Sequence, residues 1–437
     1  MEVQYWDSME TLSRDELKKL QLFRLKNTIQ RATSSLYYRS AFKQQHLGAE
    51  VIHSLEDIQR FPFTLRNDLS AHYPFGILSV DRSEVVRFHS NAGAYAPKKG
   101  IFYSKDDLSA WASLVARSFN TVGVIHTDIM QVMTDFGLHP TSHGCELGGE
   151  ELGVLVIPAG NISMHRHIQL MKELGTTVLY LPAGILPSLL DTFYELDLNP
   201  SLDTELRLLI VGEDPLSQQD KEKAENQLKI PIYRSYGILE INTPGMAVEC
   251  EQQQGMHVWE DYFLIEIIDP EKLSPLPAGE WGELVITTLN QEAMPLIRYR
   301  TGDITRIIEE PCSCGRTHRR IDVITHRTDE LFFIQGRALY PSQISETLKR
   351  VPEVGNNYVI YLDNIDNSDQ LIIEVEVVDN LYLDNYGKLE YLTKNISSRI
   401  FEETKILPRI KLVQNNYFTG KKEINLKQVV DKRKQPE

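Results

Sequence analysis

Between residues 80 and 330, short apolar runs alternate with amphipathic segments, and this alternation constrains the fold more than any other feature of the sequence. The apolar runs end in Gly, Pro or polar turns, as buried strands do: IMQVMTDF, GVLVIPAG, TTVLYLPAG and LRLLIVGED. The intervening segments HRHIQLMKEL and SQQDKEKAENQL have the polar and apolar spacing of helices. Strands that alternate with helices predict a parallel sheet covered by helices, with ligands at the carboxyl ends of the strands.

The two ends of the chain have different patterns. Residues 1–60 favour helices, with Ser13 as a cap followed by acidic residues in the first turn. After residue 330 the pattern is typical of a smaller α+β unit, and we place the boundary near Asp329. The sequence therefore predicts an α/β chain with a large multi-sheet domain of residues 1–328 and a small domain of residues 329–437.

The charge balance restricts the partners of this 437-residue chain. Its net charge of −15 argues against non-specific binding to nucleic acids or anionic membranes, which requires a positive field. No apolar run approaches the roughly 18 residues of a membrane span, and the N-terminus lacks an apolar signal core. Four cysteines do not make a disulfide framework in so long a chain, and we expect a cytoplasmic protein.

Three thiols and one imidazole form two clusters, Cys250 with His257 and Cys312 with Cys314. This donor set suits tetrahedral zinc, and four protein ligands would close the site, which is the arrangement of a structural metal. The alternative is that these are free buried thiols, since cysteine is often a packing residue. We predict structural Zn²⁺, with His318 as a weaker substitute for His257.

A Tyr236-Gly237 turn followed by Glu240, and later an RYRTGD run ending at Asp303, indicate a nucleotide site. The aromatic ring can cover adenine, Glu240 can hold a hard cation through oxygen, and Asp303 can accept hydrogen bonds from ribose hydroxyls. On their own, both acids are equally typical of plain turns. The two arginines of the run, Arg298 and Arg300, have the alternative of pairing within a solvated network.

Other candidates follow strands. SNAGAYAPKKG, residues 90–100, places Gly93 and nearby lysines where they would cradle a phosphate, although spacing alone favours a flexible turn. Further polar loops follow two buried strands, where a parallel sheet presents ligand contacts. Their alternative role is helix capping and solubility. The residues concerned are Gly212, Glu213, Asp214 and Pro215 in one loop and Asp135, Phe136 and His139 in the other.

The chain resembles the phenylacetate–coenzyme A ligases of the adenylate-forming superfamily almost from end to end. The resemblance is carried by the Tyr236…Glu240 turn and by HVWED, EAMPLIRYRTGD, CSCGRTHRRID and VVDKRK. It implies an adenylation domain with a small mobile lid domain, and a homodimer. It also implies two reaction steps: a carboxylate attacks the α-phosphate of Mg-ATP, and a thiol, usually of coenzyme A, then displaces AMP.

The resemblance also implies roles for individual residues. Tyr236 would stack on adenine, Glu240 would bind Mg²⁺, Asp303 would hold the ribose, and Arg327 would contact ribose or phosphate. Residues 212–215 would lie beside the acyl and adenine pockets. The acyl pocket would be lined by Asp135, Phe136, His139 and Ile238.

Three departures from the family pattern all lie on the phosphate side. Only Gly93 keeps its place in the phosphate loop, whose hydroxyl residues are lost, and Leu239 stands where a hydroxyl is expected. Asn425 stands at the position of the adenylation lysine, for which Lys421 or Lys427 would have to substitute. Losing one such cation typically costs about 3–4 kcal/mol of transition-state stabilisation.

These departures leave three functional hypotheses open. The first is a ligase that makes an acyl-adenylate and passes the acyl group to coenzyme A or another nucleophile. The second is a catalytically weakened homologue that binds a nucleotide or acyl-AMP, and the third is an amide-forming ligase with an amine acceptor. Because buried unpaired carboxylates are costly, Glu213 and Asp135 predict a polar or amine-bearing acid as substrate.

Overall fold

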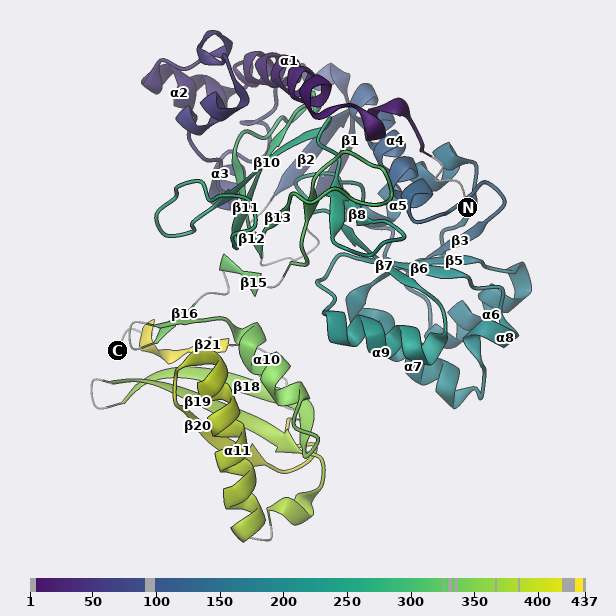
Figure 1. Ribbon diagram of the computed structural model, residues 1–437, viewed down its shortest axis with the longest axis vertical. Coiled ribbons are helices and arrows are strands. Elements are labelled where there is room, and N and C mark those ends of the chain that lie inside the picture. The colour runs from purple at the N-terminus through teal and green to yellow at the C-terminus, as the bar shows by residue number, and fades with distance from the viewer. Residues whose placement is uncertain are drawn as a thin grey trace. The chain divides into compact units, whose positions relative to one another are not determined.

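The computed structural model describes residues 5–90, 99–324, 326–328, 332–334, 337–365, 368–383, 386–418 and 429–434. The chain divides into two compact units, Met1–Ile324 and Thr325–Glu437 (Figure 1). The expected boundary residue, Asp329, lies outside the described residues. Among the helices of the described ranges, none is both long enough and apolar enough to span a membrane.

The first unit begins with helices, as predicted. The Ser13 side chain caps α1 and forms a reciprocal capping box with Glu16. One face of α1 buries Leu25, Ile29 and Ala32 in the main hydrophobic core. The helices of this region are α1 (Arg14–Ala32), α2 (Leu36–Gln45) and α3 (Arg66–Ala71).

A mixed sheet dominates the first unit, with strand order β13-β14-β9-β8-β7-β6-β5-β3-β4. The strands from β4 to β7 pair in parallel, and β8, β9, β14 and β13 continue the sheet in antiparallel pairs. The parallel strands are β3 (Ile129–Val132), β4 (Leu155–Ile157), β5 (Val178–Pro182), β6 (Leu208–Gly212) and β7 (Ile232–Tyr236). The antiparallel extension contains β8 (Ala247–Glu249), β9 (Met256–Val258), β13 (Ile307–Ile308) and β14 (Arg320–Ile321).

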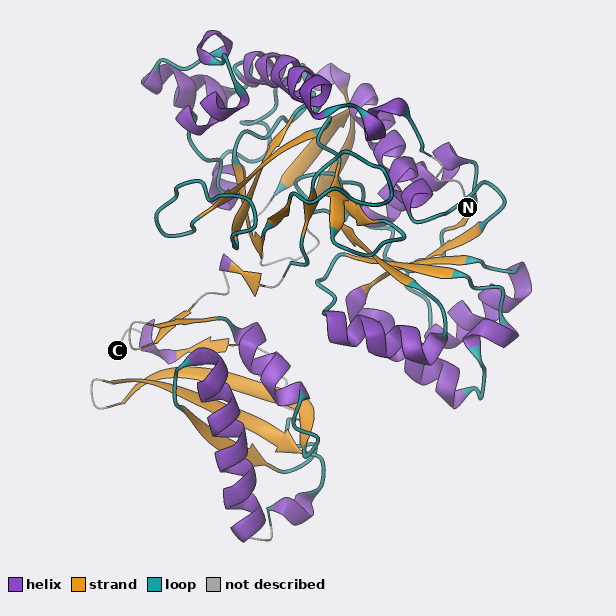
Figure 2. Cartoon of the chain, viewed as in Figure 1, coloured by secondary structure: helices purple, strands orange, loops and turns teal. Residues whose placement is uncertain are grey.

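Helices cover both faces of the parallel strands, which explains why those strands are mostly apolar (Figures 1 and 2). Alternate residues of β5 enter different cores: Val178 and Tyr180 join the main cluster, whereas Leu179 and Leu181 join a second one. The covering helices are α4 (Lys105–Thr121), α5 (Thr141–Leu152), α6 (Met164–Leu174), α7 (Leu186–Glu195), α8 (Pro200–Asp203) and α9 (Gln218–Leu228).

A second, antiparallel sheet of the first unit contains β10 (Phe263–Ile268), β11 (Gly282–Thr288) and β12 (Tyr299–Thr305). β12 runs through Thr301, Gly302 and Asp303, so the alternative of a plain turn at Asp303 does not hold. Gly302 has φ +80° next to an irregularity in the β11–β12 register, which is a conformation that favours glycine. A hairpin of β1 (Val85–Ser90) and β2 (Gly100–Ser104) completes the unit.

The second unit is the α+β arrangement that the sequence predicts. Its sheet has strand order β20-β19-β18-β21, and α10 and α11 pack against it (Figure 1). Its elements are β15 (His326–Arg327), β16 (Phe332–Ile334), β17 (Arg337–Leu339), α10 (Pro341–Lys349), β18 (Val354–Ile365), β19 (Ser368–Val377), α11 (Tyr386–Thr404), β20 (Pro408–Val413) and β21 (Val429–Asp431).

Candidate active site

The carboxyl ends of β3, β6 and β7 lie at one edge of the mixed sheet, because these strands run parallel. The register aligns Pro182 at the end of β5 with Gly212 at the end of β6, and Val211 with Arg234 of β7. The three loops that carry the predicted acyl and nucleotide residues therefore leave the sheet at the same edge.

Tyr236 and Asp303 lie in direct contact although they come from different sheets. The Tyr236 hydroxyl, at the end of β7, donates a hydrogen bond of 2.5 Å to Asp303 Oδ2 on β12. Asp303 is 3% exposed. After Tyr236 the chain turns tightly, and a Cβ on Gly237 would lie 2.8 Å from the backbone oxygen of Asn242. The predicted adenine and ribose residues thus share one small polar cluster.

Glu240 lies in the loop after β7 and is 3% exposed. Its Oε1 accepts a hydrogen bond of 2.5 Å from Lys99 Nζ and another of 2.9 Å from the Tyr299 hydroxyl. Burial disfavours the charged carboxylate, but the charge and hydrogen bonds of its partners outweigh burial and hold the pKa of Glu240 below its ordinary value. The predicted cation-binding carboxylate is therefore ionised and paired with an ammonium group.

The loop after β6 approaches neighbouring strands closely. A Cβ on Gly212 would collide with the Tyr180 hydroxyl and lie 3.4 Å from the backbone oxygen of Ser235, so glycine is required here. Glu213 follows with φ +66°, and its carboxylate is exposed and accepts a hydrogen bond of 2.6 Å from Thr134 Oγ1. Asp214 and Pro215 are also exposed.

The predicted acyl-pocket residues lie around the loop after β3 and at the β7 turn. Phe136 and His139 are partly buried, and the Phe136 ring packs edge-on against His143 at the start of α5. Ile238 is partly buried against the main core. Asp135 is exposed, like Glu213, so the expected burial of these two carboxylates was wrong: both remain in contact with water.

The arginines of the RYRTGD run pair with acidic residues. Arg298 is 4% exposed and donates two hydrogen bonds, of 3.0 and 2.9 Å, to Glu266. Arg300 forms an ion pair of 2.5 Å with Glu283 on the adjacent strand. Both arginines therefore follow the structural alternative, although the Arg298 pair is buried rather than solvated.

The four predicted metal ligands come together. Cys250 Sγ lies 3.6 Å from Cys312 Sγ, and Cys314 Sγ lies 3.4 Å from His257 Nε2. All four ligand atoms lie within 4.8 Å of one another, and all four residues are buried. A zinc ion at about 2.3 Å from sulfur and 2.0 Å from nitrogen requires ligand separations of about 3.5–3.8 Å, so the donor set fits zinc.

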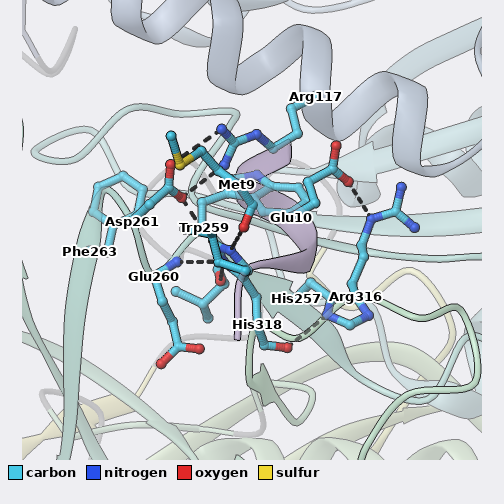
Figure 3. A network of polar contacts seen from close by, with 12 residues as sticks. Met9, Glu10, Arg117, His257, Trp259, Glu260, Asp261, Phe263, Arg316 and His318 are labelled. Carbon is cyan, nitrogen blue, oxygen red and sulfur yellow. Dashed lines mark hydrogen bonds and ion pairs between the residues drawn. The ribbon is translucent and has the colours of Figure 1, made fainter. Parts of the chain in front are cut away.

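Contacts outside this cluster orient its imidazole. His257 Nδ1 donates to the backbone oxygen of His318 at 3.0 Å, which leaves Nε2 facing the sulfurs. His318 itself accepts from the Glu260 backbone N–H at 2.9 Å and contacts the Met9 backbone oxygen at 2.9 Å (Figure 3). With both ring nitrogens engaged elsewhere, His318 is not a member of the cluster.

The segment that carries Cys312 and Cys314 also contacts the residues just before α1. The Arg316 guanidinium pairs with Glu10 at 2.6 Å, and both side chains are buried (Figure 3). The Thr317 hydroxyl donates to the backbone oxygen of Leu12 at 2.6 Å. A metal that fixes the loop would therefore also fix the residues that lead into α1.

Buried ion pairs extend this network into α4. Arg117 on α4 donates to Asp261 at 2.8 Å (Figure 3). It also donates to Asp7 at 2.6 Å. Glu260 is fully buried and contacts Arg319 at 2.7 Å. Burial opposes ionisation, but Arg319 and Arg14 outweigh it and lower the pKa of Glu260 to about 2.

Several predicted site residues remain predictions. Gly93, Lys421 and Lys427 lie outside the described residues, as does Asn425. Arg327 is partly buried on β15 of the second unit. Leu239 is 8% exposed and belongs to the main hydrophobic core.

The sequence indicated Lys99 only as one of the lysines near Gly93 that would cradle a phosphate. It did not indicate the contact of Lys99 with Glu240, because that contact depends on how the β1–β2 hairpin is placed in three dimensions. Tyr299 was not predicted as a site residue, and its signal is its position four residues before Asp303 on one strand.

Comparisons with known proteins agree with this geometry. Residues 97–291 match the model of the AMP-binding enzyme family, and residues 336–433 match that of the AMP-binding enzyme C-terminal domain. A phenylacetate-coenzyme A ligase from Thermus thermophilus is 34% identical over 380 residues, which cover 86% of this chain and 85% of the relative.

Solved structures show the same fold. A 2-hydroxyisobutyryl-CoA ligase in the postadenylation state, in complex with 2-HIB-AMP, superposes with a TM-score of 0.84 at 26% identity, covering 97% of this chain and 91% of that one. The same ligase in complex with 2-HIB-AMP and CoA, in its thioesterification state, gives a TM-score of 0.70 at 26% identity over the same shares of both chains.

Proposed function

This chain belongs to the phenylacetate–coenzyme A ligase family of AMP-binding enzymes, and we propose that it activates a carboxylic acid with ATP and transfers the acyl group to coenzyme A. In the first step the carboxylate attacks the α-phosphate, an acyl-adenylate forms and pyrophosphate leaves. In the second, the thiol attacks the acyl carbonyl and AMP leaves. The observation that carries the proposal is the contact of Tyr236 with Asp303 beside the sheet edge where Glu240 also lies.

Each residue has a role in this proposal. The Tyr236 ring would cover adenine, while Asp303 would accept hydrogen bonds from ribose hydroxyls in place of the tyrosine hydroxyl that it now accepts. Phe136 would contact the acyl group from the loop after β3. Mg²⁺, when bound with ATP, would neutralise phosphate charge, and Glu240 is the carboxylate that would hold it.

We propose a polar or amine-bearing acid as the substrate class. The support is the charge of Glu213 and Asp135 near the expected acyl pocket, which a cationic substituent would complement. Exposure of both carboxylates makes this preference modest, because water also solvates them. A panel of amino-substituted and unsubstituted arylacetates tests the proposal. Glu213→Gln should reduce the preference for the amino-substituted arylacetates. Equal selectivity in both proteins would contradict it.

One observation favours the second candidate function, a nucleotide-binding homologue with weakened catalysis. Leu239 is a core residue where the family has a hydroxyl that touches phosphate, so this position contributes no polar contact to phosphate. Such a protein would bind AMP well and form acyl-AMP slowly. Binding and turnover therefore have to be measured on the same sample.

We also propose that Cys250, His257, Cys312 and Cys314 hold a structural Zn²⁺ ion. Four buried protein donors leave no ligand position for a substrate water. Metal analysis of the purified protein should give one zinc per chain, and Cys314→Ser should lower that content. Cys145→Ala is the matched control, because Cys145 is buried outside this cluster. Zinc absent from the untreated protein would contradict the assignment.

The first experiment is ATP–pyrophosphate exchange across a panel of aromatic, heteroaromatic and amino-substituted acids, with AMP binding measured in parallel. Exchange with any acid supports the ligase. Product formation that requires coenzyme A supports the thiol acceptor, whereas formation with amines alone supports an amide-forming ligase. AMP binding without exchange supports the weakened homologue. Light scattering of the same sample tests the expected homodimer.

A further inference from the structure

Lys99 contacts the one carboxylate that the proposed function assigns to a divalent cation. Its ammonium lies 2.5 Å from Glu240 Oε1, and both residues are buried, at 7% and 3% exposed. A lysine is rarely buried so deeply without an anionic partner, because removing an ammonium from water is costly. The ammonium therefore occupies the place beside Glu240 that a bound cation would take.

The backbone holds Lys99 at this position. Ser90 pairs with Gly100 at the end of the β1–β2 hairpin, and the Ser90 hydroxyl donates to the Lys99 backbone oxygen at 2.5 Å. Lys99 is thus the residue at which the chain re-enters the hairpin. Its backbone is held by the hairpin, and its side chain extends from there to Glu240. The ion pair is therefore buried and not exposed to solvent.

Among the described residues, Lys99 is the cation with a hydrogen bond to Glu240. The Tyr299 hydroxyl donates to the same Oε1 at 2.9 Å, and Arg66 acts on that tyrosine. Tyr103 has a buried hydroxyl without a hydrogen-bond partner among the described residues, and the charge of Glu240 acts on it too. Lys99 is the cation that neutralises Glu240.

We propose that Lys99 is a positioning residue that serves as the resident counter-ion of Glu240, so that a divalent cation reaches this carboxylate only by displacing the ammonium. Two cations at one carboxylate oxygen repel each other strongly in a buried site. Mg²⁺ also requires nearly octahedral oxygen coordination at about 2.0–2.1 Å, which an ammonium on that oxygen obstructs. The inference rests on the proposed function only in taking Glu240 as the cation-binding carboxylate.

The proposal predicts that the protein binds free divalent cations weakly and binds AMP without them. The test uses Mn²⁺ alone as the probe, titrated into nucleotide-free protein and followed by electron paramagnetic resonance. Lys99→Met removes the ammonium and keeps the chain length, so Mn²⁺ should bind at least about tenfold more tightly, which is about 1.4 kcal/mol. Lys105→Met, an exposed lysine at the start of α4, should leave the titration unchanged.

A second substitution assigns any gain to Glu240. In Lys99→Met with Glu240→Gln, the tighter Mn²⁺ binding should disappear. The proposal is overturned if Lys99→Met binds Mn²⁺ no more tightly than the parent protein, or if the gain survives loss of the Glu240 charge. Neither Mn²⁺ titration depends on turnover. A protein without pyrophosphate exchange would refute the proposed function, and the two titrations would still test the role of Lys99.

Stability gives an independent measurement. Lys99→Met leaves a buried carboxylate unpaired and should lower the melting temperature, and MnCl₂ should restore it more in the variant than in the parent. If Lys99→Met does not fold, Lys99→Gln supplies a neutral hydrogen-bond donor for the same titration. A variant whose melting temperature does not respond to MnCl₂ would overturn the proposal.

Discussion

Replacing Asp303 by asparagine tests the nucleotide site most directly. Asp303 is 3% exposed on β12 and accepts a hydrogen bond of 2.5 Å from the Tyr236 hydroxyl. The substitution keeps the shape and removes the charge, so ribose hydroxyls would meet a neutral amide in place of a carboxylate. Hydrogen bonds to charged groups contribute about 1.5–3 kcal/mol and neutral ones about 0.5–1.5 kcal/mol.

This difference converts into an expected loss of affinity. If the carboxylate accepts from two ribose hydroxyls, its neutralisation should cost about 1.4–2.8 kcal/mol, which raises the Kd for AMP about tenfold to a hundredfold. Isothermal titration calorimetry measures both proteins under the same conditions. Tyr236→Phe is the matched control, since it keeps the ring that we propose covers adenine and removes only the hydroxyl bound to Asp303.

The ligand provides the decisive comparison. 2′,3′-Dideoxy-AMP keeps the adenine and phosphate and lacks both hydroxyls, so Asp303→Asn should bind it as well as the parent protein does. Loss of AMP affinity that is equally large for the dideoxy nucleotide would refute the ribose role of Asp303. An unchanged Kd for AMP would refute it as well, provided that both proteins have the same melting temperature.

Three further predictions concern stability around the Cys/His cluster. If the cluster holds zinc, a strong chelator should lower the melting temperature by at least about 5 °C and increase proteolysis before α1, because the segment that carries Cys312 and Cys314 also contacts the residues before α1. Unchanged cleavage would contradict this coupling. Glu260→Gln should lower the free energy of unfolding by about 3 kcal/mol, as measured by urea unfolding at pH 7. Because the folded pKa of Glu260 lies near 2 and its ordinary value is 4.5, the difference between the proteins should shrink as pH falls through this range, and a pH-independent difference would be inconsistent. Arg316→Met removes the cation that pairs with buried Glu10 and should lower the free energy of unfolding by about 3–5 kcal/mol in the same assay. Arg166→Met removes an exposed ion pair and should lower it by at most about 1 kcal/mol. Equal losses in the two variants would contradict the argument.

The fold was predictable because its signals are local. Alternating strands and helices indicated a parallel sheet, and Ser13 marked the start of α1 through a capping box that spans four residues. The alternative of a plain turn at Asp303 also rested on a local signal, because glycine between polar residues is typical of a turn. Pairing with β11 instead keeps Asp303 in a strand, with Gly302 absorbing the irregular register.

The candidate site was predictable in its residues and less so in its contacts. Periodicity placed Glu213 at a strand end, where a ligand would meet it, but it does not determine how much of a loop water reaches. Glu213 has a positive φ and is exposed, so the cost of burying its charge does not arise. The Cys/His cluster was easier to find, because cysteine and histidine in a narrow spacing have few other reasons to occur together.

The ion pair of Lys99 with Glu240 shows what limits such predictions. The two residues are 141 positions apart, and their contact depends on the β1–β2 register and on the turn after β7 together. In the sequence, Lys99 is one of two adjacent lysines in a polar segment, which is typical of a solvated loop or a phosphate contact. Its burial is decided by the carboxylate it meets, because neither charge is tolerated there without the other. A cation-binding residue inferred from a motif therefore has to be checked against the side chains that distant strands bring to it.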